Sequence, residues 1–321
     1  MTRKTLTVPF VAGVAAAAAA SLLLSACGSD SSKGDKTAGG GGASGTIASK
    51  LILGGPAEFA TRPDGVPGLK KIYGATFQSF KTLDTGGPVT VTSLKNGQVD
   101  AADLFTTDPA IKANNFVVLT DPKSNFGAQN VLPLINKSKA TAGVKQVLNF
   151  ISSKLTTQNL IDLRTKVEVN KEDPDKAAQE YLQSLNPPTT TPAKGVSITV
   201  GSANFPENVV LADIYADALQ AAGANVTKKL NIGSREKYIP GLKDGSIDLI
   251  PEYSGVLLQY FDKGATATSS DAVFSALQKA VPSTLTVLDQ SQAQDADAIV
   301  VTKATADKYH LTSIADLAKK A

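Results

Sequence analysis

Short apolar segments alternate with longer amphipathic ones along most of the chain, and this rhythm predicts its secondary structure. The predicted strands are residues 51–53, 77–80, 99–104, 116–119, 197–200, 226–230, 247–250 and 298–301. The predicted helices are 66–73, 88–95, about 140–167, one that Pro206 opens, one that ends near 244–245, 254–261 and 271–281. Strands that alternate with helices of this length predict an α/β fold with mostly parallel sheets. In such folds ligands bind outside the carboxyl ends of the strands.

Residues 186–195 interrupt this rhythm with Asn-Pro-Pro-Thr-Thr-Thr-Pro-Ala-Lys-Gly, which has no apolar period. Such a stretch is typical of a linker between two folded segments. The phrase Leu-Lys-x-Gly-x-(Ile/Val)-Asp occurs once in each segment, at 94–100 and 242–248. In both places a glycine ends a helix and a strand begins. The repetition indicates two similar lobes that face a cleft, although any α/β unit can use such a phrase.

The first residues indicate where the protein works. Arg3 and Lys4 precede an almost uninterrupted apolar run over 8–24, which is too short to span a membrane and fits a signal peptide. The run ends in Leu-Ser-Ala-Cys at 24–27, the pattern of a bacterial lipobox, so we expect residues 1–26 to be removed and Cys27 to carry a lipid. The alternative is a plain secretory signal followed by an unrelated cysteine.

The Gly- and Ser-rich residues 27–48 cannot bury enough apolar area to fold, so we interpret them as a flexible tether. No later apolar stretch approaches the length of a membrane span. We therefore expect the protein at the outer face of the cell membrane, held there by its lipid.

Composition excludes several function classes. The 321 residues are 42% hydrophobic and 19% charged, which is enough to fold around a core, and the net charge of +3 is too small to indicate a nucleic-acid partner. With one Cys and one His, no disulfide within the chain and no zinc site built mainly from these residues can form. The Gly-Gly-Pro turns lack the Lys-Ser/Thr ending of a phosphate loop. We expect neither a cofactor nor a metal.

Several ordered motifs carry a resemblance to a known family. After the linker they are Val-Gly-Ser-Ala-Asn-Phe-Pro-Glu at 200–207, Gly-Ser-Arg-Glu at 233–236 and Asp-Leu-Ile-Pro-Glu-Tyr-Ser-Gly at 248–255. Before it they are Gly-Gly-Pro at 54–56, Arg-Pro-Asp-Gly-Val-Pro-Gly-Leu at 62–69, 103–108 and Lys-Leu-Thr-Thr at 154–157. Together they resemble the substrate-binding proteins of glycine betaine/choline ABC transporters, which take up quaternary amines. The resemblance covers nearly all of 51–185 and 197–321.

The order of the two segments departs from the family. There, the segment that resembles 197–321 comes first and the one that resembles 51–185 follows. This exchange predicts a circular permutation, in which the linker joins what are the family's two ends. Such a rearrangement is tolerated where the original ends lie close together, because a short linker closes the gap at modest entropic cost.

The resemblance implies a two-lobe periplasmic-binding-protein fold, type II-like, with a ligand cleft between lobes. One lobe would comprise 120–185 and 196–296, and the other 49–119 completed by 297–321. It also implies a monomeric binding protein, not an enzyme, whose lobes close around a small molecule and present it to a membrane permease.

The resemblance implies an aromatic cage for a quaternary ammonium, which is held by ring faces and nearby carboxylates. Tyr253 and Phe105 match family aromatic positions, and Phe205 lies at a turn that lines the family's cleft. The residues beside these rings that we expect at the site are Asn204, Thr106 and Asp108.

Arg62 could clamp a carboxylate or form a structural ion pair. Two positions depart from the family: Asp297 and Gln129 stand where choline and betaine binders often carry Tyr. Asp297 could attract a cation, whereas Gln129 favours a ligand with hydrogen-bonding groups. The two phenylalanines could equally belong to the core, and Tyr253 could cap a packed turn.

Three other functions stay open from the residues alone. The fold could bind a different small polar or aromatic ligand, which the departures at Asp297 and Gln129 favour. An enzyme on this scaffold would need a spaced acid–base pair in the cleft, and no such pair stands out. The cleft could also be vestigial, against which Tyr253, Phe105 and Arg62 argue.

Overall fold

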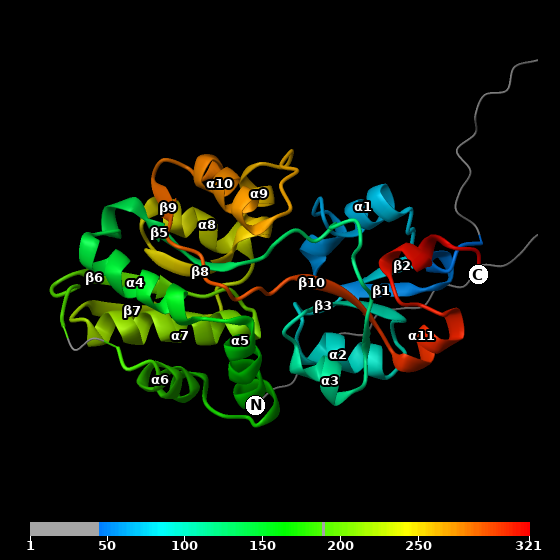
Figure 1. The fold of residues 1–321 in the computed structure, drawn as a ribbon, viewed down its shortest axis with the longest axis horizontal. Coiled ribbons are helices and arrows are strands. Elements are labelled where there is room, and N and C mark those ends of the chain that lie inside the picture. Colours follow the sequence, from blue (N-terminus) through cyan, green and yellow to red (C-terminus); the bar gives the residue numbers. More distant parts are fainter. Residues whose placement is uncertain (1–44, 188–189) are drawn as a thin grey trace, which may run out of the picture. The chain divides into compact units, whose positions relative to one another are not determined.

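The computed structural model describes residues 45–187 and 190–321, and its strands form two five-stranded sheets (Figure 1). The predicted signal peptide at 1–26 and the predicted lipidation site at Cys27 lie outside the described residues. No helix within the described ranges is both long and apolar enough to cross a membrane.

The first sheet has the strand order β2-β1-β3-β10-β4. β1 (Ile52–Gly55) lies parallel to β2 (Ser79–Thr82) and β3 (Ala101–Phe105). β10 (Asp297–Val301) runs antiparallel to β3 and to β4 (Val117–Val118).

The second sheet repeats this pattern in the order β7-β6-β8-β5-β9. β6 (Ser197–Gly201) lies parallel to β7 (Asn225–Lys229) and β8 (Leu249–Tyr253). β5 (Val131–Asn136) runs antiparallel to β8 and to β9 (Leu285–Val287).

The prediction of mostly parallel sheets was wrong, because each sheet has two parallel and two antiparallel pairings. The antiparallel pairings are those of β10 and β5. Each of these strands follows a connection that arrives from the other sheet, so it enters its new sheet in the opposite direction. A buried apolar strand looks the same in sequence whichever way it runs.

Helices pack against these sheets. The α-helices are α1 (Val66–Gly68), α2 (Pro88–Lys95), α3 (Pro109–Ala113), α4 (Ala142–Lys154), α5 (Thr157–Arg164), α6 (Pro174–Ser184), α7 (Pro206–Ala221), α8 (Arg235–Asp244), α9 (Ser254–Phe261), α10 (Ser270–Ala280) and α11 (Lys303–Tyr309). Shorter helical turns span Ala48–Lys50, Ala57–Ala60, Leu69–Tyr73, Lys137–Lys139, Thr165–Val169 and Ile314–Ala318.

The predicted long helix over 140–167 is broken in two. Leu155 is extended, and Thr156 starts α5 with a capping box in which its hydroxyl accepts from the backbone N–H of Asn159. The Asn159 side chain in turn accepts from the backbone N–H of Thr156 at 3.0 Å. This local pairing satisfies the first turn of a new helix and changes the direction of the chain.

The first described residues pair with the last. Thr46 forms an antiparallel bridge with Lys320, and the backbone N–H of Ala321 donates to the carbonyl of Gly45 at 2.9 Å. Ile47 and Ala48 are buried in the core of the first sheet. The predicted tether at 27–48 therefore reaches into the folded body at its end.

The described part of the linker packs against the end of α7. Ala193 is fully buried, and its N–H donates to the carbonyl of Ala222 at 3.0 Å. The N–H of Gly195 donates to the carbonyl of Gly223 at 3.2 Å.

Two connections, residues 119–130 and 288–296, link the sheets, and they run side by side (Figure 1). Asn130 and Gln294 form an antiparallel bridge, and the N–H of Asp295 donates to the carbonyl of Gln129 at 3.1 Å. Such paired crossing segments are where a two-lobe protein can bend.

Candidate ligand-binding site

A small cavity of about 20 Å³ is lined by residues from both sheets and from both connections. This is room for about one water molecule. Surface hollows of about 580 and 330 Å³ open beside it, and Glu58 lines all three spaces. Another hollow of about 580 Å³, near the amino ends of β6 and β7, has no aromatic lining residue. The cavity that both sheets share is therefore the candidate site.

Three predicted aromatic residues meet at this cavity. Phe105 ends β3, Phe205 precedes α7 and Tyr253 ends β8. The ring centroids of Phe105 and Phe205 are 6.0 Å apart, and those of Phe205 and Tyr253 are 6.4 Å apart. The three rings form one wall, which we call the aromatic wall.

Tyr253 is held in place by its hydroxyl. The hydroxyl donates to Glu207 Oε1 at 2.6 Å and accepts from Asn208 Nδ2 at 3.4 Å. Burial, together with the nearby carboxylate of Glu207, raises the pKa of Tyr253 well above its ordinary value. The hydroxyl therefore stays neutral, and its hydrogen bonds hold the ring in place within the aromatic wall.

Arg62 is engaged in ion pairs, which is the structural alternative that the sequence left open. Its Nε donates to Asp64 Oδ1 and its Nη2 to Asp297 Oδ2, both at 2.6 Å. Asp297 lines the cavity, but its charge is balanced by Arg62. Beside this pair, burial and the charge of Asp297 raise the pKa of Asp103 well above its ordinary value.

Gln129 lines the cavity, and its side chain caps the first turn of α9. Its Oε1 accepts from the backbone N–H groups of Gly255 and Val256, each at 3.0 Å. Its Nε2 is buried and has no hydrogen-bond partner among the described residues. One half of the side chain is thus fixed by the helix, and the other half is unpaired.

Asp295 also lines the cavity, although the sequence analysis did not identify it as a site residue. Thr107 Oγ1 donates to its Oδ1 at 2.5 Å, whereas Oδ2 is buried without a hydrogen-bond partner in the described part of the chain. Burial raises the pKa of Asp295 to about 6, although Arg164 and the Thr107 hydroxyl favour the charged form. At neutral pH the group is a carboxylate.

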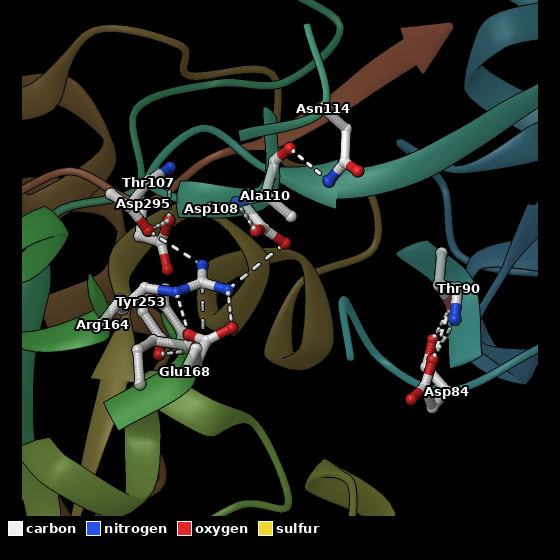
Figure 2. Close-up of polar contacts among 11 residues, drawn as sticks. Asp84, Thr90, Thr107, Asp108, Ala110, Asn114, Arg164, Glu168, Tyr253 and Asp295 are labelled. Carbon is white, nitrogen blue, oxygen red and sulfur yellow. Dashed lines mark hydrogen bonds and ion pairs between the residues drawn. The ribbon is translucent and has the colours of Figure 1, made fainter. Parts of the chain in front are cut away.

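Arg164 is the centre of a polar cluster, and Figure 2 shows its contacts with Thr107, Asp108 and Glu168. It is fully buried at the end of α5, and its guanidinium lies 5.8 Å from the Phe105 ring centroid. It donates to Thr107 Oγ1 at 3.0 Å and to Glu168 Oε1 at 2.6 Å. Asp108 and Glu207 complete its surroundings, at 3.4 and 3.9 Å.

The sequence analysis did not identify Arg164, because an arginine in the last turn of a helix is ordinarily explained by its favourable interaction with the helix dipole. Arg235 and Glu252 were also missed as site residues, although both stand within the family-like motifs. Arg235 lines the cavity, and its Nη2 donates to Glu252 Oε2 at 2.8 Å. Tyr238 donates to the other oxygen of Glu252 at 2.6 Å.

Three predicted site residues lie away from the cavity lining. Asn204 is exposed and lines only the 330 Å³ hollow. Thr106 is exposed, and its Oγ1 accepts from the N–H of Ala296 at 3.1 Å, which ties β3 to a connection. Asp108 caps α3 and pairs with Arg164. Thr106 and Asp108 thus hold neighbours of the site in place.

Two kinds of comparison report similar sequences. A family model described as the substrate binding domain of ABC-type glycine betaine transport system matches residues 44–184 and 196–321. Among curated relatives, a glycine-betaine-binding protein of Pseudomonas aeruginosa is 30% identical over 130 residues, which is 39% of this chain and 41% of the relative. The ergothioneine transport permease/ergothioneine binding protein EgtU of Helicobacter pylori is 31% identical over 134 residues, 41% of this chain and 24% of the relative.

A third relative, the carnitine transport binding protein OpuCC of Listeria monocytogenes, is 28% identical over 125 residues, 38% of this chain and 40% of the relative. Each match spans less than half the length of the relative. Among solved structures, an ancestral arginine-binding protein bound to arginine aligns with a TM-score of 0.41 and 13% identity, over 85% of this chain and 91% of that one.

The family match decides what kind of protein this is. It covers both segments around the linker, and the two mixed sheets with paired connections form the two-lobe α/β architecture that the sequence predicts. The chain belongs to the substrate-binding domains of ABC-type glycine betaine transport systems.

Proposed function

We propose that the protein is a lipid-anchored, extracytoplasmic binding protein, not an enzyme, that delivers a glycine betaine- or choline-like quaternary amine to an ABC permease. The observation that carries this proposal is the aromatic wall of Phe105, Phe205 and Tyr253 in a cavity shared by both sheets. A quaternary ammonium donates no N–H bond, so ring faces are its natural partners, at about 0.5–2 kcal/mol per contact.

The charges around the wall also favour a cation. Asp295 lines the cavity without an ion-pair partner among the described residues, whereas Asp297 is paired with Arg62. An unpaired carboxylate in a buried setting attracts a positive group strongly because little water screens it.

Binding by cleft closure follows from the size of the cavity. A volume of about 20 Å³ is far below that of a quaternary amine, so the two sides must part for the ligand to enter. The paired connections at 119–130 and 288–296 are the segments about which the sides would move. Ligand then drives closure only as far as it prefers the closed state.

A second candidate is the same binding role with a different small polar or aromatic ligand. Gln129 and the paired Arg62 and Asp297 bring polar groups to a cavity that a full aromatic cage would line with rings. The similarity to a protein named for ergothioneine favours this candidate as well.

A thermal-shift screen of the full chain tests the proposal. Glycine betaine, choline and carnitine, with ectoine, proline and aromatic acids as comparison, would each be added in excess. A ligand at a hundred times its Kd stabilises the native state by about 2.7 kcal/mol, which raises Tm. We expect a shift with at least one quaternary amine that Tyr253→Ala abolishes and that the control Tyr309→Ala, at a half-buried tyrosine outside the cavity lining, preserves. A shift only with another compound would establish the second candidate instead.

We also propose that the chain is circularly permuted within its family. Gly45 and Ala321 are hydrogen-bonded neighbours, so the chain could be continuous there. Each curated relative aligns over only about 40% of this chain, although the family model matches both segments. That is expected when a single collinear alignment can cover only one of two exchanged segments.

A further inference from the structure

Two of the buried polar atoms on the connections belong to cavity-lining residues and have no hydrogen-bond partner in the part of the chain that the structure describes. They are Nε2 of Gln129 and Oδ2 of Asp295, and both residues line the cavity beside the aromatic wall. The two residues are themselves linked, because the N–H of Asp295 donates to the carbonyl of Gln129 at 3.1 Å. A buried polar group without a hydrogen bond is rare in a folded protein and calls for a physical explanation.

The orientation of the Gln129 amide is fixed by its neighbours. Its Oε1 accepts from two backbone N–H groups, those of Gly255 and Val256. A flipped amide would place its NH₂ against these two donors, which is unfavourable. The unpaired group of Gln129 is therefore a donor.

The unpaired atom of Asp295 is an acceptor, for a reason that begins at Arg164. A guanidinium can only donate, so the 3.0 Å contact with Thr107 makes Thr107 Oγ1 an acceptor there. The single hydrogen of that hydroxyl then goes to Asp295 Oδ1, 2.5 Å away. Oδ2 of the carboxylate is left with its acceptor capacity unused.

We propose that Asp295 and Gln129 form a polar subsite that recognises a hydroxyl or N–H group next to the ammonium of the ligand. This deepens the proposed function and rests on it. A hydroxyl is the smallest group that can donate to Asp295 Oδ2 while it accepts from Gln129 Nε2. The ligand class is then a quaternary amine that carries a hydrogen-bond donor, in contrast to glycine betaine, which offers acceptors only.

Such a subsite discriminates between ligands, because a ligand without the hydroxyl leaves buried polar groups of the protein without hydrogen bonds. A site built to hydrogen-bond a ligand's hydroxyl disfavours the analogue without it, because the buried groups of the protein then stay unsatisfied. Arg164 and Thr107 act as positioning residues for Asp295, since Thr107, held by Arg164, occupies Oδ1 and leaves Oδ2 for the ligand.

Matched ligand pairs test the proposal by titration calorimetry with the full chain. Choline is compared with ethyltrimethylammonium, and carnitine with γ-butyrobetaine, because the members of each pair differ by one hydroxyl. We expect the hydroxyl-bearing member of the pair that binds to have a Kd lower by tenfold or more, which is about 1.4 kcal/mol. Asp295→Asn keeps the acceptor for Thr107 but turns the free atom into a donor, so the preference should shrink to about threefold or less.

The control is Asp289→Asn, an exposed carboxylate on the same connection, which should leave the preference unchanged. Equal affinities within each pair, or a preference that survives Asp295→Asn, would overturn the subsite and leave the proposed function intact. If no quaternary amine binds, both the subsite and the proposed function fail.

Discussion

At the residue scale, the site depends on a few side chains whose charges and hydrogen bonds constrain one another. Tyr253 contributes a ring face to the wall and a hydroxyl to Glu207. Burial and the charge of Asp295 raise the pKa of Glu207, although Arg164 nearby opposes this shift. Recognition of a cation here therefore depends on the protonation of Glu207 and Asp295 as well as on the shape of the wall.

Replacing Tyr253 separates these two contributions. Tyr253→Phe keeps the ring face but leaves Glu207 Oε1 without the hydroxyl, so we expect a loss of about 1–3 kcal/mol in the free energy of unfolding. Ligand binding should weaken far less than in Tyr253→Ala. Urea unfolding and titration with the best ligand measure the two effects. A Phe variant that binds as poorly as the Ala variant would contradict a role for the ring face.

The pH dependence of binding should report Asp295. Its folded-state pKa is raised from 3.8 to about 6, so its contribution to folding is fully present below the unfolded value and is lost as pH rises through about 6. Cation binding has the opposite trend, because only the carboxylate attracts the ligand, and affinity should fall as pH is lowered through about 6. Calorimetry across this range, with Asp295→Asn as control, checks the sign.

Asp295→Asn itself should stabilise the ligand-free protein at neutral pH. It removes a buried charge that has no ion-pair partner in the described residues, and each unit of pKa shift corresponds to about 1.4 kcal/mol. Chemical unfolding of the variant beside the parent measures this gain. A variant that is clearly less stable than the parent would mean that the charge is better compensated than its contacts indicate.

At the scale of elements, α5 brings Arg164 to the base of the cavity. The capping box at Thr156 breaks the long helix, and the shorter helix that follows ends with Arg164 beside Thr107, Asp108 and Phe105. Arg164→Ala would leave several buried carboxylate contacts unpaired, so we expect a loss of about 3–5 kcal/mol in unfolding free energy.

Arg164→Lys should be intermediate, since a lysine keeps the charge but lacks the planar fork that reaches both Thr107 and Glu168. Equilibrium denaturation of both variants measures the difference. If the alanine variant is as stable as the parent, the central role of Arg164 in the polar cluster is wrong.

Much of the element pattern could be predicted from the sequence, and two of the failures involve proline. The helices 88–95 and 254–261 appear as predicted, because apolar spacing and flanking residues determine them locally. β5 was missed and β8 was predicted to stop at Pro251, since proline usually weakens a strand. In the structure, Pro133 of β5 lies opposite Pro251 of β8. Both prolines therefore weaken the pairing of the two strands at the same position.

The candidate site was predictable only in part. Tyr253, Phe205 and Phe105 were found because aromatic residues in family-like turns are conspicuous, and they do meet at one cavity. Asp295 and Arg164 were not found, because their environments are made by residues far away in the chain. No local pattern shows that residues 107, 164 and 295 converge.

At the scale of the whole molecule, the order of the segments can be tested directly. A chain that starts at residue 196, joins Ala321 to Gly45 and ends at 185 should fold with the same two sheets, because the junction already pairs Gly45 with Ala321. Circular dichroism and Tm of the reordered chain, with and without ligand, are the measurements. A reordered chain that does not fold would contradict the permutation.

The lipid anchor is a prediction from the sequence that cell fractionation can test. Cys27→Ala should move the protein from the membrane fraction to the soluble extracytoplasmic fraction, since a single cysteine is available to carry the lipid. Ligand binding should not change, because the described binding residues lie elsewhere in the chain. Retention of the variant in the membrane fraction would show that something other than this lipid holds it.

The central claim is that the aromatic wall binds a quaternary ammonium through the positive charge of the ligand. The most direct measurement is a calorimetric comparison of choline with its neutral tert-butyl analogue, in which carbon replaces nitrogen and the shape is kept. The account predicts that choline binds tenfold or more tightly, about 1.4 kcal/mol or more, and that Tyr253→Ala removes most of this difference. Equal affinities for the two compounds would show that the cavity recognises apolar shape and would contradict the account.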